Sequence, residues 1–378
     1  MSIKVQKVFR GRGSLRKTPQ MLEKLHMSHP LIVGGDLLTG ELIRKNPGLM
    51  TSALFNGYHP NPDLTDADEG ARIFLRQACD GLISIGGGSA MDTAKAIQAI
   101  LAAGSIENVK AGRIPEEMTV PHLSIPGTAG SGSEATPYAV VYDENRKLSL
   151  SSPGLMPDGV ILDASLLDSL PIYHKKSCAL DALSQGIESF WCRAATDDSR
   201  VHAYLAILGV LDNLKAYLTG DPHAADEMMD AAYQSGKAIS ITRTTAAHAM
   251  SYQITKKLGP AHGHACMLTL PVLWDEMNRD EEMKETLNQL AAVMRLGDPQ
   301  MGPKLLKGLL YDLEMEIPAM PDEETLNLLA ESVNPERLGN HPTEMKREDV
   351  KRVYRKAFLP AGAAEKQACL DIWRYYGR

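Results

Sequence analysis

The chain has 378 residues, of which 44% are hydrophobic and 23% charged; this length and balance are typical of a globular protein with two domains. Its net charge of -7 and the lack of any basic block make nucleic acid and anionic membranes poor partners. No apolar run approaches the roughly 20 residues of a membrane helix, and the N-terminal segment lacks the apolar core of a secretory signal.

Short β-rich runs alternate with helical stretches over residues 1–171. The runs expected to form strands are 29–35, 50–56, 81–87, 122–127, 140–144 and the start of 160–171, and the helical stretches include 66–79 and 90–104. Alternation of this kind is typical of a mainly parallel sheet covered by helices. We therefore predict an α/β domain over residues 1–171.

The pattern changes near residue 171. From Tyr173 onward, apolar residues recur at helical spacing and β-branched runs nearly vanish. This periodicity predicts an all-helical second domain over residues 172–378.

Two glycine-rich loops follow strand-like runs of the first domain. Gly86, Gly87 and Gly88 precede Ser89 and a helical stretch, where small residues and free helix amides suit a phosphate. The segment 126–137 places hydroxyl residues among glycines and suits a pyrophosphate or a ribose. The first loop lacks the GxGxxG pattern of a standard dinucleotide-binding loop, so a tight strand-to-helix turn is its alternative. A flexible connection is the alternative for the second loop.

The five cysteines are scattered along the chain and include no CxxC pair. An odd, dispersed set is typical neither of a disulfide framework nor of a thiolate zinc site. We therefore expect a reduced, cytoplasmic protein in which the histidines carry more information.

A carboxylate and several imidazoles in the second domain suit a metal ion. Asp181 and Gln185 are four residues apart and share one face of a helix, while His248 and His262 are fourteen apart and converge only if a loop returns the second. Such donors suit Fe²⁺ or Zn²⁺ with an open position for a substrate oxygen. Taken singly, each histidine is better explained as a surface residue or a satisfied core residue than as a ligand.

Taken together, these stretches resemble the iron-containing (group III) alcohol dehydrogenase family over residues 30 to 360. The matching pieces are 61–62, 86–96, 126–136, 162–171, 181–189 and 248–265. The resemblance implies the dehydroquinate synthase-like fold, with a dinucleotide-binding domain over 1–171 and a metal- and substrate-binding domain over 172–378. It also implies a metal-dependent, NAD(P)-linked alcohol dehydrogenase or aldehyde reductase that forms a homo-oligomer.

The metal ligands that this resemblance implies are Asp181, Gln185, His248 and His262. Gln185 stands where the family usually has a histidine, and its amide oxygen is a weaker and harder ligand than an imidazole. Tyr252 stands where the family often has a further histidine. We expect it either to donate a hydrogen bond to the substrate or to pack on its helix.

The cofactor contacts that the resemblance implies are Gly87, Gly88, Ser89, Asp92, Thr128, Ser131 and Lys147. A plain surface lysine is the alternative for Lys147. Gly34 and Gly35 end the first strand of the family pattern, where NAD-preferring members tend to have an aspartate, and Asp36 follows one residue later. Glycines leave room for a 2′-phosphate that a carboxylate would repel, so we favour NADPH over NADH.

Within the family, residues 181–191 and 242–265 resemble the phosphonoacetaldehyde reductase (hydroxyethylphosphonate dehydrogenase) branch. This resemblance implies reduction of phosphonoacetaldehyde to 2-hydroxyethylphosphonate. A phosphonate dianion needs cations and donors, for which we name Arg243, His264 and Arg337 as candidates. A surface position is the alternative for Arg337, and Arg243 is the favoured cation.

Three other functions remain open. In the first, the protein is a reductase of the same fold whose substrate is a diol, a glycerol-type or lactaldehyde-like molecule, or a simple aliphatic aldehyde. A lyase or synthase of the related fold retains NAD instead of consuming it. A non-catalytic binding protein has lost its metal, and Gln185 is the feature that keeps this alternative open.

Overall fold

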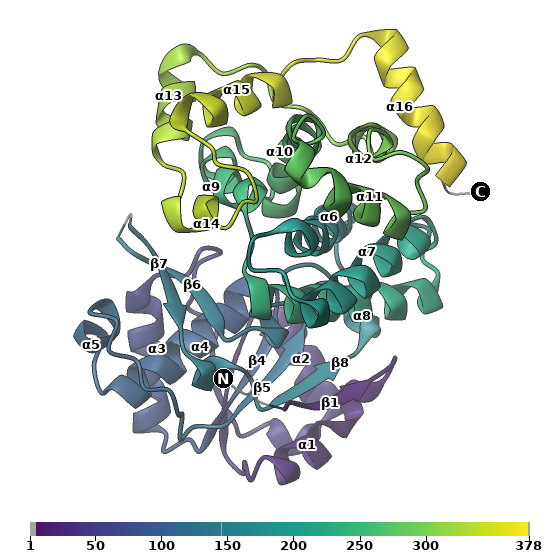
Figure 1. Cartoon of the computed structure of the whole chain (residues 1–378). Coiled ribbons are helices and arrows are strands. Elements are labelled where there is room, and N and C mark those ends of the chain that lie inside the picture. Colours follow the sequence, from purple (N-terminus) through teal and green to yellow (C-terminus); the bar gives the residue numbers. More distant parts are fainter. Residues whose placement is uncertain (1–4, 145, 377–378) are drawn as a thin grey trace. The chain divides into compact units, whose positions relative to one another are not determined.

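The computed structural model describes residues 5–144 and 146–376 (Figure 1). It divides the chain into two compact units: residues 1–170 together with 220–236, and residues 171–219 together with 237–378. The first is an α/β unit and the second is helical, so the predicted fold class is confirmed.

The first unit contains eight described strands, five complete α-helices and most of α8 (Pro222–Thr242). The strands are β1 (Lys7–Arg10), β2 (Pro30–Gly34), β3 (Ala53–Phe55), β4 (Gly81–Gly86), β5 (His122–Pro126), β6 (Tyr138–Asp143), β7 (Arg146–Ser151) and β8 (Gly159–Leu162). The helices are α1 (Thr18–Lys24), α2 (Asp36–Lys45), α3 (Leu64–Arg76), α4 (Gly88–Ala103) and α5 (Ile106–Lys110). Each expected strand is present, and β1 and β7 were not anticipated.

Six strands form one parallel sheet in the order β1-β8-β5-β4-β2-β3. From β2 the chain passes first to β3 on one side and then to β4 on the other. The strand order therefore reverses between β2 and β4. In open α/β sheets, ligands bind outside the carboxyl ends of the strands at such a reversal.

Strand side chains alternate between the two faces of this sheet, because the side-chain period of a strand is two. On β2, Leu31 and Val33 pack with residues of α3 and α4, whereas Ile32 packs with residues of α1 and α2. Helices thus cover both faces, as is usual for parallel sheets.

The run predicted as a strand at 140–144 does not join the parallel sheet. It lies in β6, which pairs antiparallel with β7 as a separate two-stranded sheet. On β7, Leu150 is buried while its neighbours Ser149 and Ser151 are more exposed. This alternation is typical of an antiparallel ribbon with one solvated face. A β-rich run in the sequence does not by itself show whether its strand joins such a ribbon or the central sheet.

The second glycine loop packs tightly on α8 (Pro222–Thr242). A Cβ at Gly132, whose φ is +61°, would lie 2.5 Å from the Cα of Gly236, and a Cβ at Gly236 would lie even closer to the carbonyl oxygen of Gly132. Only glycines permit this approach. It explains why residues 220–236 group with the first unit.

The second unit has no strand among its described residues. Its helices are α6 (Ile172–Trp191), α7 (Asp197–Leu218), the last residues of α8, α9 (Ala246–Leu258), α10 (His262–Met277), α11 (Lys284–Val293), α12 (Met301–Asp312), α13 (Glu323–Glu331), α14 (Pro335–Gly339), α15 (Arg347–Ala357) and α16 (Ala363–Tyr376). No helix in the described part of the chain is long and apolar enough to cross a membrane.

Candidate functional site

Four potential metal-binding side chains converge in the helical unit. Donor atoms of Asp181 on α6, His248 on α9, and His262 and Cys266 on α10 all lie within 4.8 Å of one another. The Asp181 Oδ1 atom is 3.2 Å from His248 Nε2 and 3.8 Å from His262 Nε2. Three of the four ligands expected from the sequence therefore lie together, and Cys266 is an addition that the sequence analysis missed.

Accessibility differs sharply within this group. The side chains of Asp181 and His248 are 8% and 3% exposed, whereas that of His262 is 38% exposed. The group is therefore buried on the side of α6 and α9 and open on the side of His262, where a small molecule can approach it.

A glycine brings α10 onto α6 at this point. A Cβ on Gly263 would lie 2.6 Å from the Cβ and 2.7 Å from the backbone nitrogen of Asp181, and closer still to the carbonyl oxygen of Ser177. Real side chains do not occupy such space, so only glycine lets the two helices come this close. The contact places His262 and Cys266, on either side of Gly263, beside Asp181.

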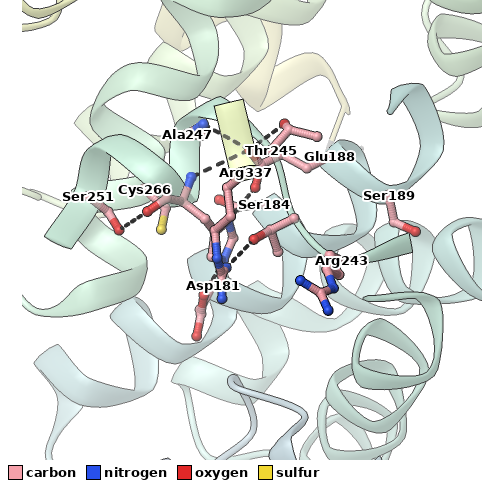
Figure 2. A network of polar contacts seen from close by, with 12 residues as sticks. Asp181, Ser184, Glu188, Ser189, Arg243, Thr245, Ala247, Ser251, Cys266 and Arg337 are labelled. Carbon is pink, nitrogen blue, oxygen red and sulfur yellow. Dashed lines mark hydrogen bonds and ion pairs between the residues drawn. The ribbon is translucent and has the colours of Figure 1, made fainter. Parts of the chain in front are cut away.

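The buried carboxylate of Glu188 orients His248 (Figure 2). The Nδ1–H group of His248 donates to Glu188 Oε2, and Glu188 Oε1 accepts from the Thr245 hydroxyl at 2.6 Å and the Ala247 amide at 2.8 Å. This arrangement leaves the Nε2 lone pair of His248 for a metal, in the way that carboxylates commonly support metal-binding histidines. Glu188 was missed, although it lies seven residues after Asp181 on the same helix face.

Ser251 performs the same task for His262. Its hydroxyl donates to the carbonyl oxygen of His248 at 2.8 Å, so its oxygen must accept from the Nδ1–H group of His262 at 3.2 Å. Nε2 of His262 is then the nitrogen free to bind a metal.

The four groups are electrostatically coupled. Burial tends to raise the pKa of Asp181, but the charge on His262 and a hydrogen bond from His248 hold it below its usual range. Burial also tends to raise the pKa of the Cys266 thiol, yet His248 and His262 lower it to about 7. Burial tends to lower the pKa values of His248 and His262, but the neighbouring Cys266 and carboxylates raise them. The protons of two imidazolium rings therefore balance the charges of a carboxylate and a thiolate, a role that a metal cation can take over.

Gln185 lies on the same face of α6 as Asp181 and is buried. Its side chain forms a hydrogen bond with the Asp181 carboxylate, which contributes to the low pKa of Asp181. Since a carboxylate only accepts, the amide group of Gln185 is the donor. Its assignment as a metal ligand stays a prediction.

The donor set fits a divalent transition metal. Ligand bonds of about 2.0–2.3 Å to oxygen, nitrogen and sulfur place neighbouring donors of a tetrahedral site about 3.3–3.6 Å apart. The observed separations of 3.2 and 3.8 Å are close to these values. Small movements of these side chains toward an ion therefore suffice to form a metal site.

The Tyr252 ring contacts both the imidazole of His262 and a guanidinium group. The Tyr252 ring stacks on His262 with a centroid distance of 5.5 Å and an interplanar angle of 14°. The Arg337 guanidinium lies 5.5 Å from the centroid of the Tyr252 ring and donates to the Thr244 hydroxyl. Tyr252 is therefore a direct neighbour of His262, and Arg337 is a direct neighbour of Tyr252.

Arg243 and His264 have other partners. Arg243, which has a positive φ of 62°, forms an ion pair with Glu336 (Figure 2 shows its position). His264 is buried, its Nδ1 is 3.2 Å from the Tyr173 hydroxyl, and burial lowers its pKa to about 4. Of the three cationic candidates, Arg337 is thus the one that lies over Tyr252.

The two glycine loops face each other at the carboxyl ends of β4 and β5. The amide of Gly127 donates to the carbonyl oxygen of Gly86 at 2.7 Å. A Cβ on Gly87 would lie 3.4 Å from Thr128 Cγ2, and one on Gly88 would lie 3.3 Å from Ser131 Oγ. No side chain caps the N-terminus of α4, so its first amides are available to a phosphate.

Ser89 and Asp92, both predicted cofactor contacts, hold neighbouring chain segments. The Ser89 hydroxyl donates to the carbonyl oxygen of Pro60. Asp92 accepts from the Ser133 hydroxyl at 2.8 Å and from the Val140 amide at 3.0 Å. Burial raises the pKa of Asp92, against the opposing charges of Lys95 and, more weakly, Lys147.

Lys95 is a further residue that the sequence analysis did not identify. Its buried ammonium donates to the Ser133 carbonyl oxygen at 2.6 Å, to the Thr136 hydroxyl at 3.1 Å and to the Tyr138 carbonyl oxygen at 2.7 Å. Burial lowers its pKa to about 8. It ties α4 to the second glycine loop and so sets the distance between the two loops.

The end of β2 contains the residues expected to select the cofactor. Gly34 is required by packing, because a Cβ there would lie 2.6 Å from the carbonyl oxygen of Ile85, whereas a Cβ on Gly35 would meet open space. The Asp36 carboxylate accepts from the Asn56 side chain at 2.7 Å, at the end of the adjacent β3. Of these two glycines, only Gly35 therefore borders open space at the end of β2.

Two family models match the chain. The model described as iron-containing alcohol dehydrogenase matches residues 5–164, and the C-terminal model of the Fe-containing alcohol dehydrogenase family matches residues 176–358. Together they include both glycine loops and all four clustered donors.

Individual relatives are consistent with these matches. Phosphonoacetaldehyde reductase of Streptomyces viridochromogenes is 36% identical over 227 residues, a region that covers 56% of this chain and 57% of the relative. Choline dehydrogenase of Bacillus subtilis is 30% identical and the match covers 81% of this chain and 80% of that protein. Sulfoacetaldehyde reductase of Bifidobacterium kashiwanohense, solved in complex with NAD+, superposes with a TM-score of 0.85 at 26% identity and covers 95% of this chain and 99% of its own.

Proposed function

The chain belongs to the iron-containing alcohol dehydrogenase family, and we propose that it reduces phosphonoacetaldehyde to 2-hydroxyethylphosphonate with NADPH. The observation that carries this proposal is the position of Arg337 over Tyr252, which itself stacks on His262. A cation at this place suits a small aldehyde with an anionic head group. Two of the relatives are named for such aldehydes, one a phosphonate and the other a sulfonate.

Each part of the site has a role in this reaction. Asp181, His248 and His262 hold a divalent ion, with Glu188 and Ser251 fixing the imidazoles. Bound there, the ion supplies Lewis-acid polarisation of the carbonyl group, and the nicotinamide supplies the hydride. Arg337 binds the phosphonate, and the Tyr252 hydroxyl is a donor available to the substrate. The two glycine loops hold the cofactor phosphates.

Arg337→Ala tests the substrate assignment. We expect the KM for phosphonoacetaldehyde to rise about 10- to 100-fold, because a hydrogen bond to a charged group is worth about 1.5–3 kcal/mol. The KM for propanal, which has no charge, should change little. The matched control is Arg243→Ala, which removes a guanidinium already paired with Glu336. An equal effect of Arg337→Ala on both aldehydes, or a larger selective effect of Arg243→Ala, contradicts the assignment of Arg337.

The overall reaction is tested by following NAD(P)H oxidation with phosphonoacetaldehyde, lactaldehyde and propanal, each with and without added Fe²⁺ or Zn²⁺. Strong preference for phosphonoacetaldehyde supports the proposal. Equal rates with the uncharged aldehydes support a reductase for simple aliphatic or diol-type substrates instead. The absence of net oxidation with all three supports an NAD-retaining lyase or a binding protein.

The NADPH preference rests on the open space beside Gly35 and on the contact that directs the Asp36 carboxylate toward Asn56. Asp36 is nevertheless the nearest acidic group in sequence to this space. We expect Asp36→Ser to raise the ratio of kcat/KM for NADPH over NADH about tenfold, the effect of about 1.4 kcal/mol of like-charge repulsion. Asp68→Ser, which removes a carboxylate paired with Arg72 on α3, should leave the ratio unchanged. An unchanged ratio in Asp36→Ser removes this residue from the cofactor site.

A further inference from the structure

We propose that Cys266 is a metal ligand, that it takes the place left by the substitution of the family's histidine by Gln185, and that its thiolate makes the centre favour zinc over iron. This inference rests on the proposed metal-dependent function and concerns which side chains hold the ion. It replaces the expectation that no cysteine of this chain serves a metal.

The first argument is convergence. The Cys266 sulfur is 3.8 Å from His262 Nε2, and it belongs to the group of four donors that lie within 4.8 Å of one another. His262 and Cys266 are four residues apart on α10, so both side chains leave the same face of the helix. A scattered cysteine thus becomes a donor only because α10 packs on α6 at Gly263.

The second argument is the role of Gln185. Its amide group donates to Asp181, so this side chain orients a ligand and leaves the fourth place in the shell to another donor. Cys266 is completely buried beside the two imidazoles and is the donor available there. The count of four protein ligands is then the same as in the family, with sulfur in place of one imidazole.

The third argument concerns the choice of metal. Thiolates are soft ligands that favour Zn²⁺ over hard-ligand ions, and Zn²⁺ also binds more tightly than Fe²⁺ in the general order of divalent metals. Carboxylate, imidazole and thiolate are each ligands that zinc binds in proteins. The 38% exposure of the His262 side chain leaves one side of the shell open to a further ligand.

Cobalt substitution tests the proposal by spectroscopy rather than by activity. The purified full-length protein is stripped of metal and loaded with Co²⁺. We expect a thiolate-to-cobalt charge-transfer band in the near ultraviolet for the wild-type protein. The band should disappear in Cys266→Ser and persist in Gln185→Ala. The control is Cys369→Ser, which changes an equally buried cysteine on α16 and should keep the band.

Competition between Zn²⁺ and Fe²⁺ gives a second readout. Cys266→Ser should lower the ratio of the Zn²⁺ affinity to the Fe²⁺ affinity by at least about tenfold, since the serine oxygen is a harder donor than the cysteine sulfur. Circular dichroism establishes that each variant is folded before its metal affinity is compared.

Several results overturn the proposal. If the wild-type protein binds Co²⁺ without the charge-transfer band, Cys266 is not a ligand, whatever the folding of the variants, and the metal-dependent reductase stands. Loss of the band in Gln185→Ala but not in Cys266→Ser has the same meaning. If the wild-type protein binds none of these metals, both this inference and the metal-dependent function fail.

Discussion

His262→Ala is expected to remove bound metal and turnover together. The variant loses the imidazole that lies 3.8 Å from Asp181 and also the ring on which Tyr252 stacks. Metal affinity should fall more than about 100-fold, since even residues that only support ligands cost 10- to 100-fold. Turnover should fall about 1000-fold, because Lewis-acid polarisation is worth several kcal/mol. Metal content by elemental analysis and the rate of NADPH oxidation measure the two effects.

His264→Ala is the matched control for this experiment. The two histidines are two residues apart on α10, but His264 is buried against Tyr173 and is not among the four clustered donors. We expect it to lower thermal stability and to retain metal. Full metal content and activity in His262→Ala would remove His262 from the ligand set. A selective rise in KM for phosphonoacetaldehyde in His264→Ala would restore His264 as a substrate contact.

Gly263→Ala is expected to damage the metal centre without touching any donor. The new methyl group would lie 2.6 Å from the Cβ of Asp181 and closer to the Ser177 carbonyl oxygen, so α10 must move away from α6. Overpacking of this kind costs about 1–3 kcal/mol in the free energy of unfolding. Because His262 and Cys266 move with α10, metal affinity should also fall about 10- to 100-fold. Denaturant unfolding and metal titration measure these two losses.

Gly40→Ala provides the control for the same substitution in a helix. Gly40 lies inside α2, and a Cβ there would meet no atom within 4 Å. We expect a gain of about 1 kcal/mol in stability, because alanine is the better helix former, and an unchanged metal affinity. If Gly263→Ala binds metal as tightly as the wild type, the close approach of α10 to α6 is not what assembles the centre.

Much of the first unit follows from local sequence patterns. In this unit, β-rich runs such as 81–86 form strands, because burying their apolar side chains is favourable and β-branched residues suit a pleated sheet. The run at 140–144 also forms a strand, but its place in a separate hairpin depends on pairing with β7. Pairing partners are set by tertiary contacts, and the sequence pattern of one strand does not contain them.

The candidate site shows the same division. The family resemblance implied that Asp181, His248 and His262 act together, whereas their spacing alone left a surface or core role open, and the structure brings their donor atoms within 4.8 Å of one another. Glu188, seven residues after Asp181, and Cys266, four after His262, lie on the same helix faces as these ligands. Their roles become apparent only through the helix that packs against each face. The requirement for glycine at position 263 likewise becomes clear only from the position of α6, with which a Cβ there would collide.

The sequence by itself thus determined the fold class and the two glycine loops, which depend on periodicity and residue type, and its resemblance to the family pointed to three donors that the structure brings together. Only the tertiary structure decided which arginine lies near the site. Arg243, five residues before His248, is paired with Glu336, while Arg337, distant in the chain, lies over Tyr252. The physical reason is that distance along the chain does not measure distance in space: helices far apart in sequence pack side by side to bury their apolar faces.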